Sequence, residues 1–234
     1  MTTDETPVKR KPGRPRKSPP PEEYADLGKA PKYVPPDWAL RALKEPVLSR
    51  YNPAFHGLGY VVDFCAPADK GKTLGMVCLI IHLITECGYD PSEVWTNFPL
   101  YVPGVHRLDN TLMRMKVSEM THLATRHQIF AFDEVDSIYP ARYWQNKHHT
   151  EELLKLWQAT KLENWVIGTE HEGSGLNKLW REAVQIMVTP TYYQSTDSLR
   201  LDVIDGVDLN PYVVREVENV SRFFGIYNRW QPTS

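Results

Sequence analysis

A glycine, a lysine and a threonine stand together at Gly71, Lys72 and Thr73, directly before the apolar segment LGMVCLIIHLITEC. They follow a short loop that leaves a first apolar run, YVVDFC, at residues 60–65. Phosphate groups and Mg²⁺ are held in proteins by backbone N–H groups, an ammonium and a hydroxyl at the start of a helix. The residue types and their spacing therefore predict a phosphate-binding loop between a strand and a helix.

The loop matches the pattern G-x-x-x-x-G-K-[ST] over residues 66–73 at every position except the first, where Ala66 stands. If the backbone there needs a positive φ, alanine costs about 1 kcal/mol or more of strain; otherwise the loop tolerates it. We expect Lys72 to bridge the β- and γ-phosphates and the Thr73 hydroxyl to bind Mg²⁺. Alone, such a match is equally compatible with an ordinary loop before a helix. The residues expected to contact the nucleotide are Ala68, Asp69, Lys70, Gly71, Lys72, Thr73 and Leu74.

A second apolar run, at residues 128–132, ends in Asp133 and Glu134. An aspartate at a strand end can hold Mg²⁺, and the carboxylate after it can polarise an attacking water. By itself an Asp-Glu pair is more often a solvated turn, but here it follows the phosphate loop in the expected chain order. We therefore interpret the chain as a P-loop nucleotide hydrolase in which Lys72, Asp133 and Glu134 are catalytic and Thr73 and Asp133 bind the metal.

Composition limits the remaining possibilities. The 234 residues suffice for one α/β domain with an ample core but not for two large domains. With 27 Lys+Arg against 29 Asp+Glu, the formal charge of -2 does not draw the whole molecule to nucleic acid. The three cysteines lack CxxC spacing, which favours a reducing compartment over a disulfide framework or a zinc site. No signal peptide or membrane-spanning segment is evident, so we expect a soluble cytoplasmic protein without membrane insertion.

Residues 1–36 hold nine of the 19 prolines and few apolar side chains, which predicts a disordered arm. Within it, the segment KRKPGRPRK at residues 9–17 has no acid, and its Gly-Arg-Pro-Arg core resembles an AT-hook, which lays arginines into a narrow minor groove. A solubilising or localisation tail that binds any polyanion is nearly as compatible. The residues expected to contact DNA are Lys9, Arg10, Lys11, Arg14, Arg16 and Lys17.

Residues 37–234 alternate strand and helix patterns, with Gly and Pro at the turns. Strands are predicted at residues 60–65, 94–97, 128–132, 165–169, 185–188 and 198–204. Helices are predicted at residues 37–48, 72–87, 109–125, 151–162 with Thr150 as N-cap, 176–183, and from Asn210-Pro211 to about 224. The alternation predicts one α/β domain with a mostly parallel sheet, helices on both faces, and ligands at the carboxyl ends of the strands.

Three further segments carry a family resemblance: VWTNFPL at 94–100, IFAFDEVDSIYPAR at 129–142 and WVIGTEHEGSGLNKLWREAVQIMV at 165–188. Together with the phosphate loop they resemble the FtsK/HerA superfamily of DNA-pumping ATPases, especially its zonula-occludens-toxin-like phage proteins and viral genome-packaging ATPases. The resemblance covers about residues 59–188. It implies a RecA-like P-loop domain that uses ATP and Mg²⁺.

In that family the strand that follows the paired acids ends in Thr-Gln, whose amide can sense the γ-phosphate. Here Thr169 is followed by Glu170, a carboxylate that would repel phosphate unless it is protonated or turned away. These two residues are the candidate sensors. The resemblance also implies an arginine supplied by a neighbouring subunit. Arg142, in the aromatic-Pro-x-Arg segment, is the first candidate before Arg181 and Arg200, and a surface ion pair is the alternative for each.

The resemblance implies ATP-driven movement of double-stranded DNA by a homo-oligomeric ring, during packaging of a viral or phage genome in the host cytoplasm. Two alternatives remain open. A non-hydrolysing DNA-binding adaptor on a degenerate P-loop fold is favoured by Ala66, Glu170 and the basic arm, and a morphogenesis or secretion ATPase would move protein instead. His148, His149 and His171 lack metal-ligand spacing and are interpreted as solvated loop residues.

Overall fold

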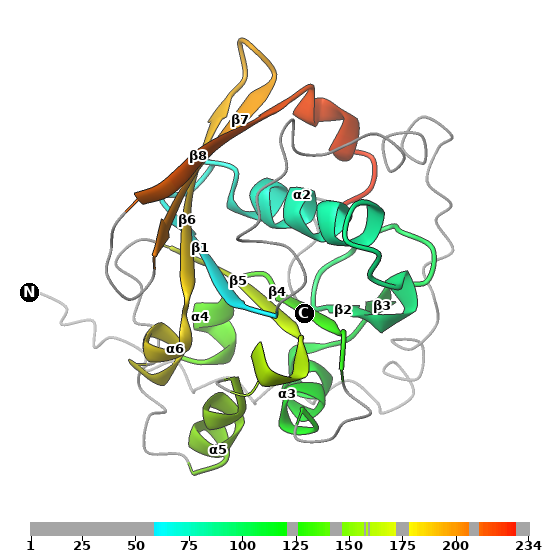
Figure 1. Ribbon diagram of the computed structural model, residues 1–234, viewed down its shortest axis with the longest axis vertical. Coiled ribbons are helices and arrows are strands. Elements are labelled where there is room, and N and C mark those ends of the chain that lie inside the picture. Colours follow the sequence, from blue (N-terminus) through cyan, green and yellow to red (C-terminus); the bar gives the residue numbers. More distant parts are fainter. Residues whose placement is uncertain are drawn as a thin grey trace, which may run out of the picture.

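The computed structural model describes residues 59–120, 126–140, 147–156, 158, 160–171, 178–205 and 211–227. They form one eight-stranded sheet in the order β3-β2-β4-β5-β1-β6-β7-β8 (Figure 1). The basic arm, the helix predicted at residues 37–48 and Arg142 lie outside the described residues. No helix within the described ranges has the length and apolar character needed to cross a membrane.

The sheet is mixed. Its parallel part contains β3 His106–Arg107, β2 Val94–Thr96, β4 Ile129–Phe132, β5 Trp165–His171, β1 Val61–Ala66 and β6 Ile186–Tyr193. Two antiparallel strands, β7 Ser198–Asp205 and β8 Pro211–Glu218, extend it beyond β6. The predicted parallel pairing therefore holds only from β3 to β6.

Helices cover both faces of the parallel part, which explains why strands such as β4 are buried along their whole length. On one face, α2 Lys72–Thr85 packs over β1, β5 and β6. The opposite face is covered by α3 Asn110–Ser118, α4 Val135–Ile138, α5 Lys147–Leu156 and α6 Lys178–Ala183 (Figure 1). The α/β class predicted from the alternating pattern is confirmed.

The helix predicted from Asn210-Pro211 to about residue 224 is wrong. Residues Pro211–Glu218 form β8, and only the 3-10 helix η7 Val220–Phe223 is helical in this region. The segment PYVVREVE carries three valines, which favour the pleated conformation, and it pairs with β7 along its length. Its proline is tolerated because β8 is an edge strand, where one missing N–H costs no ladder hydrogen bond.

Two helix boundaries also differ from the sequence expectation. Helix α5 begins at Lys147, so Thr150 lies inside it and is not its N-cap. It ends at Leu156, and residues Thr160–Leu162 form a separate 3-10 helix, η6. The capping rule misplaced this start because a threonine before two glutamates is a strong local signal, whereas α5 is also stabilised by its packing against α3 and α6, which the local sequence does not mark.

Candidate active site

The loop between β1 and α2 has a fixed and unusual backbone. Gly71, the N-cap of α2, has φ 92°, and Asp69 has φ 59°. A Cβ on Gly71 would lie 2.8 Å from Leu199 Cδ1 and 3.2 Å from Tyr192 Cβ, so both conformation and packing require glycine. Ala66 is the last residue of β1 and is not among the residues with positive φ. The strain considered for alanine at this position is therefore absent.

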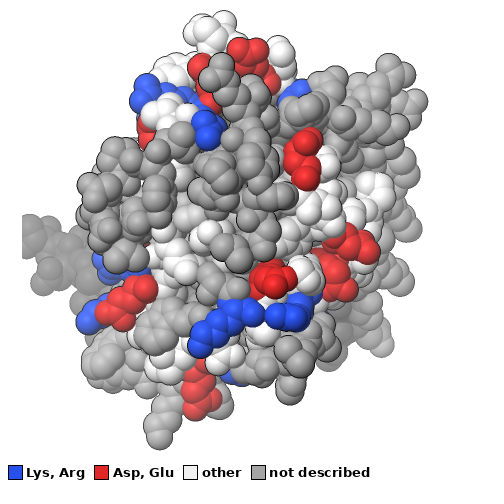
Figure 2. Space-filling model, viewed as in Figure 1, with Lys and Arg blue, Asp and Glu red and all other residues white. Residues whose placement is uncertain are grey.

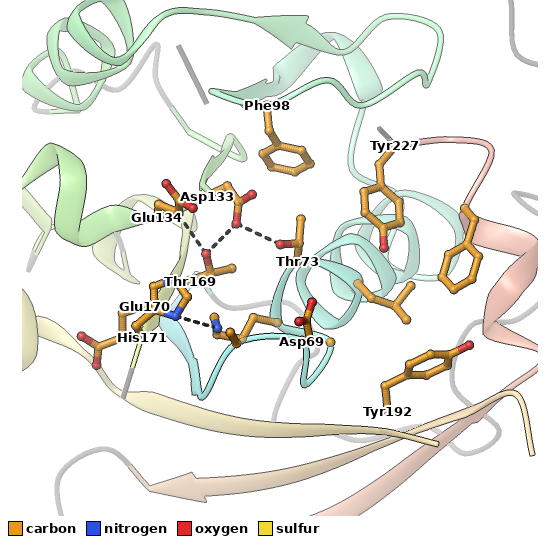
Figure 3. Close-up of a pocket in the computed structure, with 15 residues that line it drawn as sticks. Asp69, Thr73, Phe98, Asp133, Glu134, Thr169, Glu170, His171, Tyr192 and Tyr227 are labelled. Atoms are coloured by element: carbon orange, nitrogen blue, oxygen red, sulfur yellow. Dashed lines mark hydrogen bonds between the residues drawn. The ribbon is translucent and has the colours of Figure 1, made fainter. Parts of the chain in front are cut away.

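Thr73, Asp133 and Thr169 meet at the carboxyl ends of the strands (Figure 3). Thr73 Oγ1, in the first turn of α2, donates a hydrogen bond to Asp133 Oδ1 at 3.0 Å. Thr169 Oγ1, on β5, donates to the same oxygen at 2.6 Å and accepts from Glu134 N at 2.9 Å. Burial raises the pKa of Asp133 above its ordinary value, while the bonds from Thr169 and Thr73 act in the opposite direction. Three segments far apart in sequence thus form one cluster.

Asn97, which follows β2, fixes the backbone of Asp133. Its Oδ1 accepts from Asp133 N at 2.7 Å, and its Nδ2 donates to Asp133 O at 2.9 Å and to Asn110 Oδ1 at 2.9 Å. Asn97 is fully buried, so these bonds are shielded from water. From the sequence, residues 94–100 carried only a family resemblance, and no role was predicted for Asn97. The structure identifies it as a positioning residue for Asp133.

Lys72 folds back along its own loop. Its Nζ donates to the carbonyl oxygens of Ala66 and Pro67, both at 2.9 Å, and lies 3.2 Å from His171 Nδ1. Partial burial lowers the pKa of Lys72, and the charge of Asp133 opposes this shift. His171 was interpreted from sequence as a solvated loop residue, but it belongs to β5 and lines the same cavity as Lys72. Side chains alternate along a strand, so Thr169 and His171, which are two residues apart, lie on the same face. This spacing could have indicated from the sequence that His171 belongs to the site.

These residues line an open cavity of about 240 Å³. Of the residues expected to contact the nucleotide, Ala68, Asp69, Gly71, Lys72, Thr73 and Leu74 line it. Lys70 does not, although its carbonyl accepts a hydrogen bond from Tyr192 N. Asp133 and the exposed Glu134 border the cavity as predicted, and Glu134 has a left-handed backbone with φ 54° at the start of α4.

Glu170 borders this cavity, but its carboxyl group is engaged on the opposite face of the sheet. Successive side chains of β5 point to opposite faces, so Glu170 lies away from Thr169 and beside Asp63 of β1. The two carboxyl groups are hydrogen-bonded, with Asp63 1% and Glu170 7% exposed. Of the two candidate sensors, only Thr169 contacts the acids of the site.

Asp63 is an unusually buried acid. Its Oδ1 has no hydrogen-bond partner among the described residues, and Trp180 lies nearby without a hydrogen bond of normal geometry from Nε1. Burial raises the pKa of Asp63 well above its usual range, and the charges of Glu170 and Asp136 raise it further. The raised pKa favours the neutral form of the Asp63 carboxyl group beside Glu170.

Replacing Asp63 with asparagine is expected to stabilise the protein at alkaline pH. Because the pKa of Asp63 is raised in the folded state, its contribution to the free energy of unfolding is fully present below about pH 4, where the carboxyl group titrates in the unfolded chain. This stabilisation is lost as pH rises toward the folded pKa, by up to about 1.4 kcal/mol per pH unit. An amide carries no charge at any of these pH values and can donate a hydrogen bond to Glu170. Urea unfolding at several pH values should show a flatter profile for Asp63→Asn, and parallel profiles would contradict this assignment.

Among the described residues, neither of the two candidate arginines, Arg181 and Arg200, lies at the cavity. Arg142 lies outside the described residues, Arg200 is exposed on β7 and pairs with Asp202 at 2.9 Å, and Arg181 is exposed on α6. The sequence left a surface ion pair as the alternative for Arg200, and the structure shows such a pair with Asp202.

The oxygen atoms that line the cavity are of the kind that Mg²⁺ prefers as ligands. Thr73 and Asp133 supply a hydroxyl and a carboxylate oxygen, and Mg²⁺ is commonly bound by one or two protein oxygens with several retained waters. Within the described ranges, no group of three or more His, Cys, Asp or Glu residues could hold a metal ion. Thr73 and Asp133 supply two oxygen atoms of a kind that a hard cation prefers.

The fold resembles that in the crystal structure of the N-terminal domain of zonular occludens toxin from Neisseria meningitidis. The TM-score is 0.54, and the match covers 74% of this chain and 100% of that domain. At 14% sequence identity the likeness shows the fold alone. No family model and no curated protein sequence matches the chain. The eight-stranded α/β sheet is compatible with a RecA-like fold, while membership of the FtsK/HerA superfamily stays a prediction.

Proposed function

We propose that this protein is a Mg²⁺-dependent P-loop ATPase. The observation that carries the proposal is the convergence of Thr73, Asp133 and Thr169 beside the Gly71-Lys72 step, through hydrogen bonds of 3.0 and 2.6 Å. Thr73 and Asp133 would hold Mg²⁺, which when bound would neutralise charge on the β- and γ-phosphates. The chain order of these residues and the toxin-like fold support the same proposal.

The start of α2 is suited to bind the phosphates. Gly75 N donates to Gly71 O at 2.8 Å as the first helical bond, so the amides before Gly75 have no acceptor within the helix. These N–H groups and the positive end of the helix dipole attract an anion. Lys72 can exchange the carbonyls of Ala66 and Pro67 for phosphate oxygens, since these weak neutral acceptors bind an ammonium less strongly than an anion does.

Glu134 is suited to activate the attacking water. It is exposed, lines the cavity and follows Asp133, whose own carboxylate is occupied by two hydroxyl donors. Thr169 Oγ1 holds Glu134 N at 2.9 Å and thereby fixes the backbone that carries the carboxylate. We assign Glu134 as the general base, which accepts a proton from water as the water attacks the γ-phosphate.

We further propose that hydrolysis drives the movement of double-stranded DNA through a homo-oligomeric ring during viral or phage genome packaging. Support comes from the segments at residues 94–100, 129–142 and 165–188 that resemble DNA-pumping ATPases, and from the basic segment at residues 9–17. On the face in Figure 2, the described Lys and Arg residues are interspersed with Asp and Glu. The basic segment is accordingly the proposed first DNA contact.

DNA-dependent turnover tests this proposal. Double-stranded DNA should stimulate ATP hydrolysis by the full chain, measured as phosphate release. Changing the six cations of residues 9–17 to glutamine should weaken DNA binding and lower the slope of log K against log salt by up to about 5, since each phosphate contact contributes about 0.9. The variant's basal turnover is the control and should be unchanged. Turnover that DNA never alters would indicate a protein-moving ATPase, and binding of DNA without any turnover would indicate an adaptor.

A further inference from the structure

The cavity has a second, aromatic end that the proposed phosphate chemistry does not use. Tyr192, Phe224 and Tyr227 lie at this end, and Leu74 and Phe98 also line the cavity. In Figure 3, Tyr192 and Tyr227 lie on the far side of Thr73 from Asp133 and Glu134. The acids, the phosphate loop and the aromatic rings therefore follow one another along a single cavity.

The aromatic residues form a chain of edge-to-face contacts. The ring centroids of Tyr192 and Phe224 are 6.1 Å apart at an interplanar angle of 77°, and those of Phe224 and Tyr227 are 6.4 Å apart at 73°. Phe224 remains 43% exposed, whereas its neighbour Phe223 is fully buried in the core beneath α2. A large apolar ring is thus held at the cavity wall with much of its surface open to a further planar group.

Hydrogen bonds fix the position of the aromatic wall, as we call Tyr192, Phe224 and Tyr227 together. Ser221 N and Oγ donate to the carboxylate of Asp197 at 3.0 and 2.7 Å, which ties η7 to the turn between β6 and β7. Tyr101 N donates to Ile226 O at 2.6 Å, which ties the other end to the segment after β2. Tyr192 N donates to Lys70 O at 3.1 Å and so joins the wall to the phosphate loop. The rings are positioned by the same loop that would hold the phosphates.

We propose that this aromatic end is the nucleobase site, in which Phe224 and Tyr192 pack against the planar base of the bound nucleotide. The inference rests on the proposed function, because it takes the triphosphate to lie between Lys72 and the paired acids. A nucleoside triphosphate is highly charged at one end and planar and weakly polar at the other. The cavity presents complementary groups in the same order, with the phosphate loop between its two ends.

The affinities for Mg-ATP and for magnesium inorganic triphosphate, which has no base, test the site by calorimetry. Phe224→Ala should raise the Kd for ATP about 5-fold or more, since stacking of an aromatic side chain on a base contributes about 1–3 kcal/mol and each 1.4 kcal/mol is a factor of about 10. The Kd for inorganic triphosphate should not change. Phe224→Trp retains a planar ring and should restore ATP affinity. Because Phe224 is exposed, its removal leaves the core intact, and a melting curve checks this.

Tyr193→Ala is the matched control. Tyr193 follows Tyr192 on β6, is 42% exposed and does not line the cavity, so neither affinity should change. Lys72→Ala should weaken both ligands. If Phe224→Ala leaves ATP affinity within twofold, or weakens both ligands equally, the base site is wrong while the effect of Lys72 still supports the phosphate site. If the wild type binds neither ligand, the proposed function fails and the base site fails with it.

Discussion

Lys72→Ala is expected to lower the rate of ATP hydrolysis by about 10³-fold or more and to weaken ATP binding. Lys72 is the cation of the proposed phosphate loop, and its Nζ already lies within the cavity, where it donates to the carbonyls of Ala66 and Pro67 and to His171 Nδ1. In the transition state it would stabilise negative charge that no other described cation lining the cavity could neutralise. Phosphate release under steady-state conditions measures the rate, and calorimetry measures the affinity.

Lys70→Ala is the control for this substitution. Lys70 belongs to the same loop and is exposed, but its side chain does not line the cavity. The change removes an equal charge from nearly the same place in the chain, so a general electrostatic effect would appear in both variants. A Lys72→Ala protein that hydrolyses ATP at the wild-type rate would remove the proposed mechanism.

The elements of the proposed phosphate site could be predicted because their signals are local. The apolar runs that became β1, β4 and β5 are short and bounded by turn residues, and Gly71 marks the start of α2. Parallel strands in one sheet bring their carboxyl ends to the same edge, so chain order was sufficient to expect Thr73 near Asp133. The left-handed φ of Gly71 is compatible with its type, because glycine adopts a positive φ without steric cost.

The strand β8 and the aromatic wall could not be predicted in this way. Asn210-Pro211 gives a strong local helix-start signal, but β8 is stabilised by pairing with β7, which is a contact between separate segments. Tyr192 N bonds to Lys70 O, and Phe224 contacts Tyr192 while η7 is tied to the β6–β7 turn through Asp197. A single sequence carries no local mark of such contacts.

The departure at Glu170 has a structural explanation. A carboxylate next to a phosphate sensor is unfavourable if it shares the sensor's face, and the alternation of β5 places it instead beside Asp63. Burial and the charge of Glu170 raise the pKa of Asp63, which favours its neutral form at this position. Of the two possibilities raised for Glu170, protonation and reorientation, the structure shows reorientation, with the side chain beside Asp63 and away from Thr169.

Glu134→Gln is expected to retain ATP binding and to lower turnover by about 10²- to 10⁴-fold, the usual contribution of a general base. The amide preserves the size of the side chain but cannot accept a proton from water at neutral pH. The backbone should remain in place, because Thr169 Oγ1 bonds to Glu134 N rather than to the carboxylate. Single-turnover hydrolysis together with equilibrium binding separates the two effects.

Asp136→Asn provides the matched comparison, since it makes the same change from acid to amide two residues further on, in α4, at a position that does not line the cavity. It should hydrolyse ATP at nearly the wild-type rate. If Glu134→Gln instead lowers affinity and turnover equally, Glu134 contributes to binding and another group must accept the proton. If it alters neither, the water is activated elsewhere, and the exposed acid at the start of α4 has no part in the chemistry.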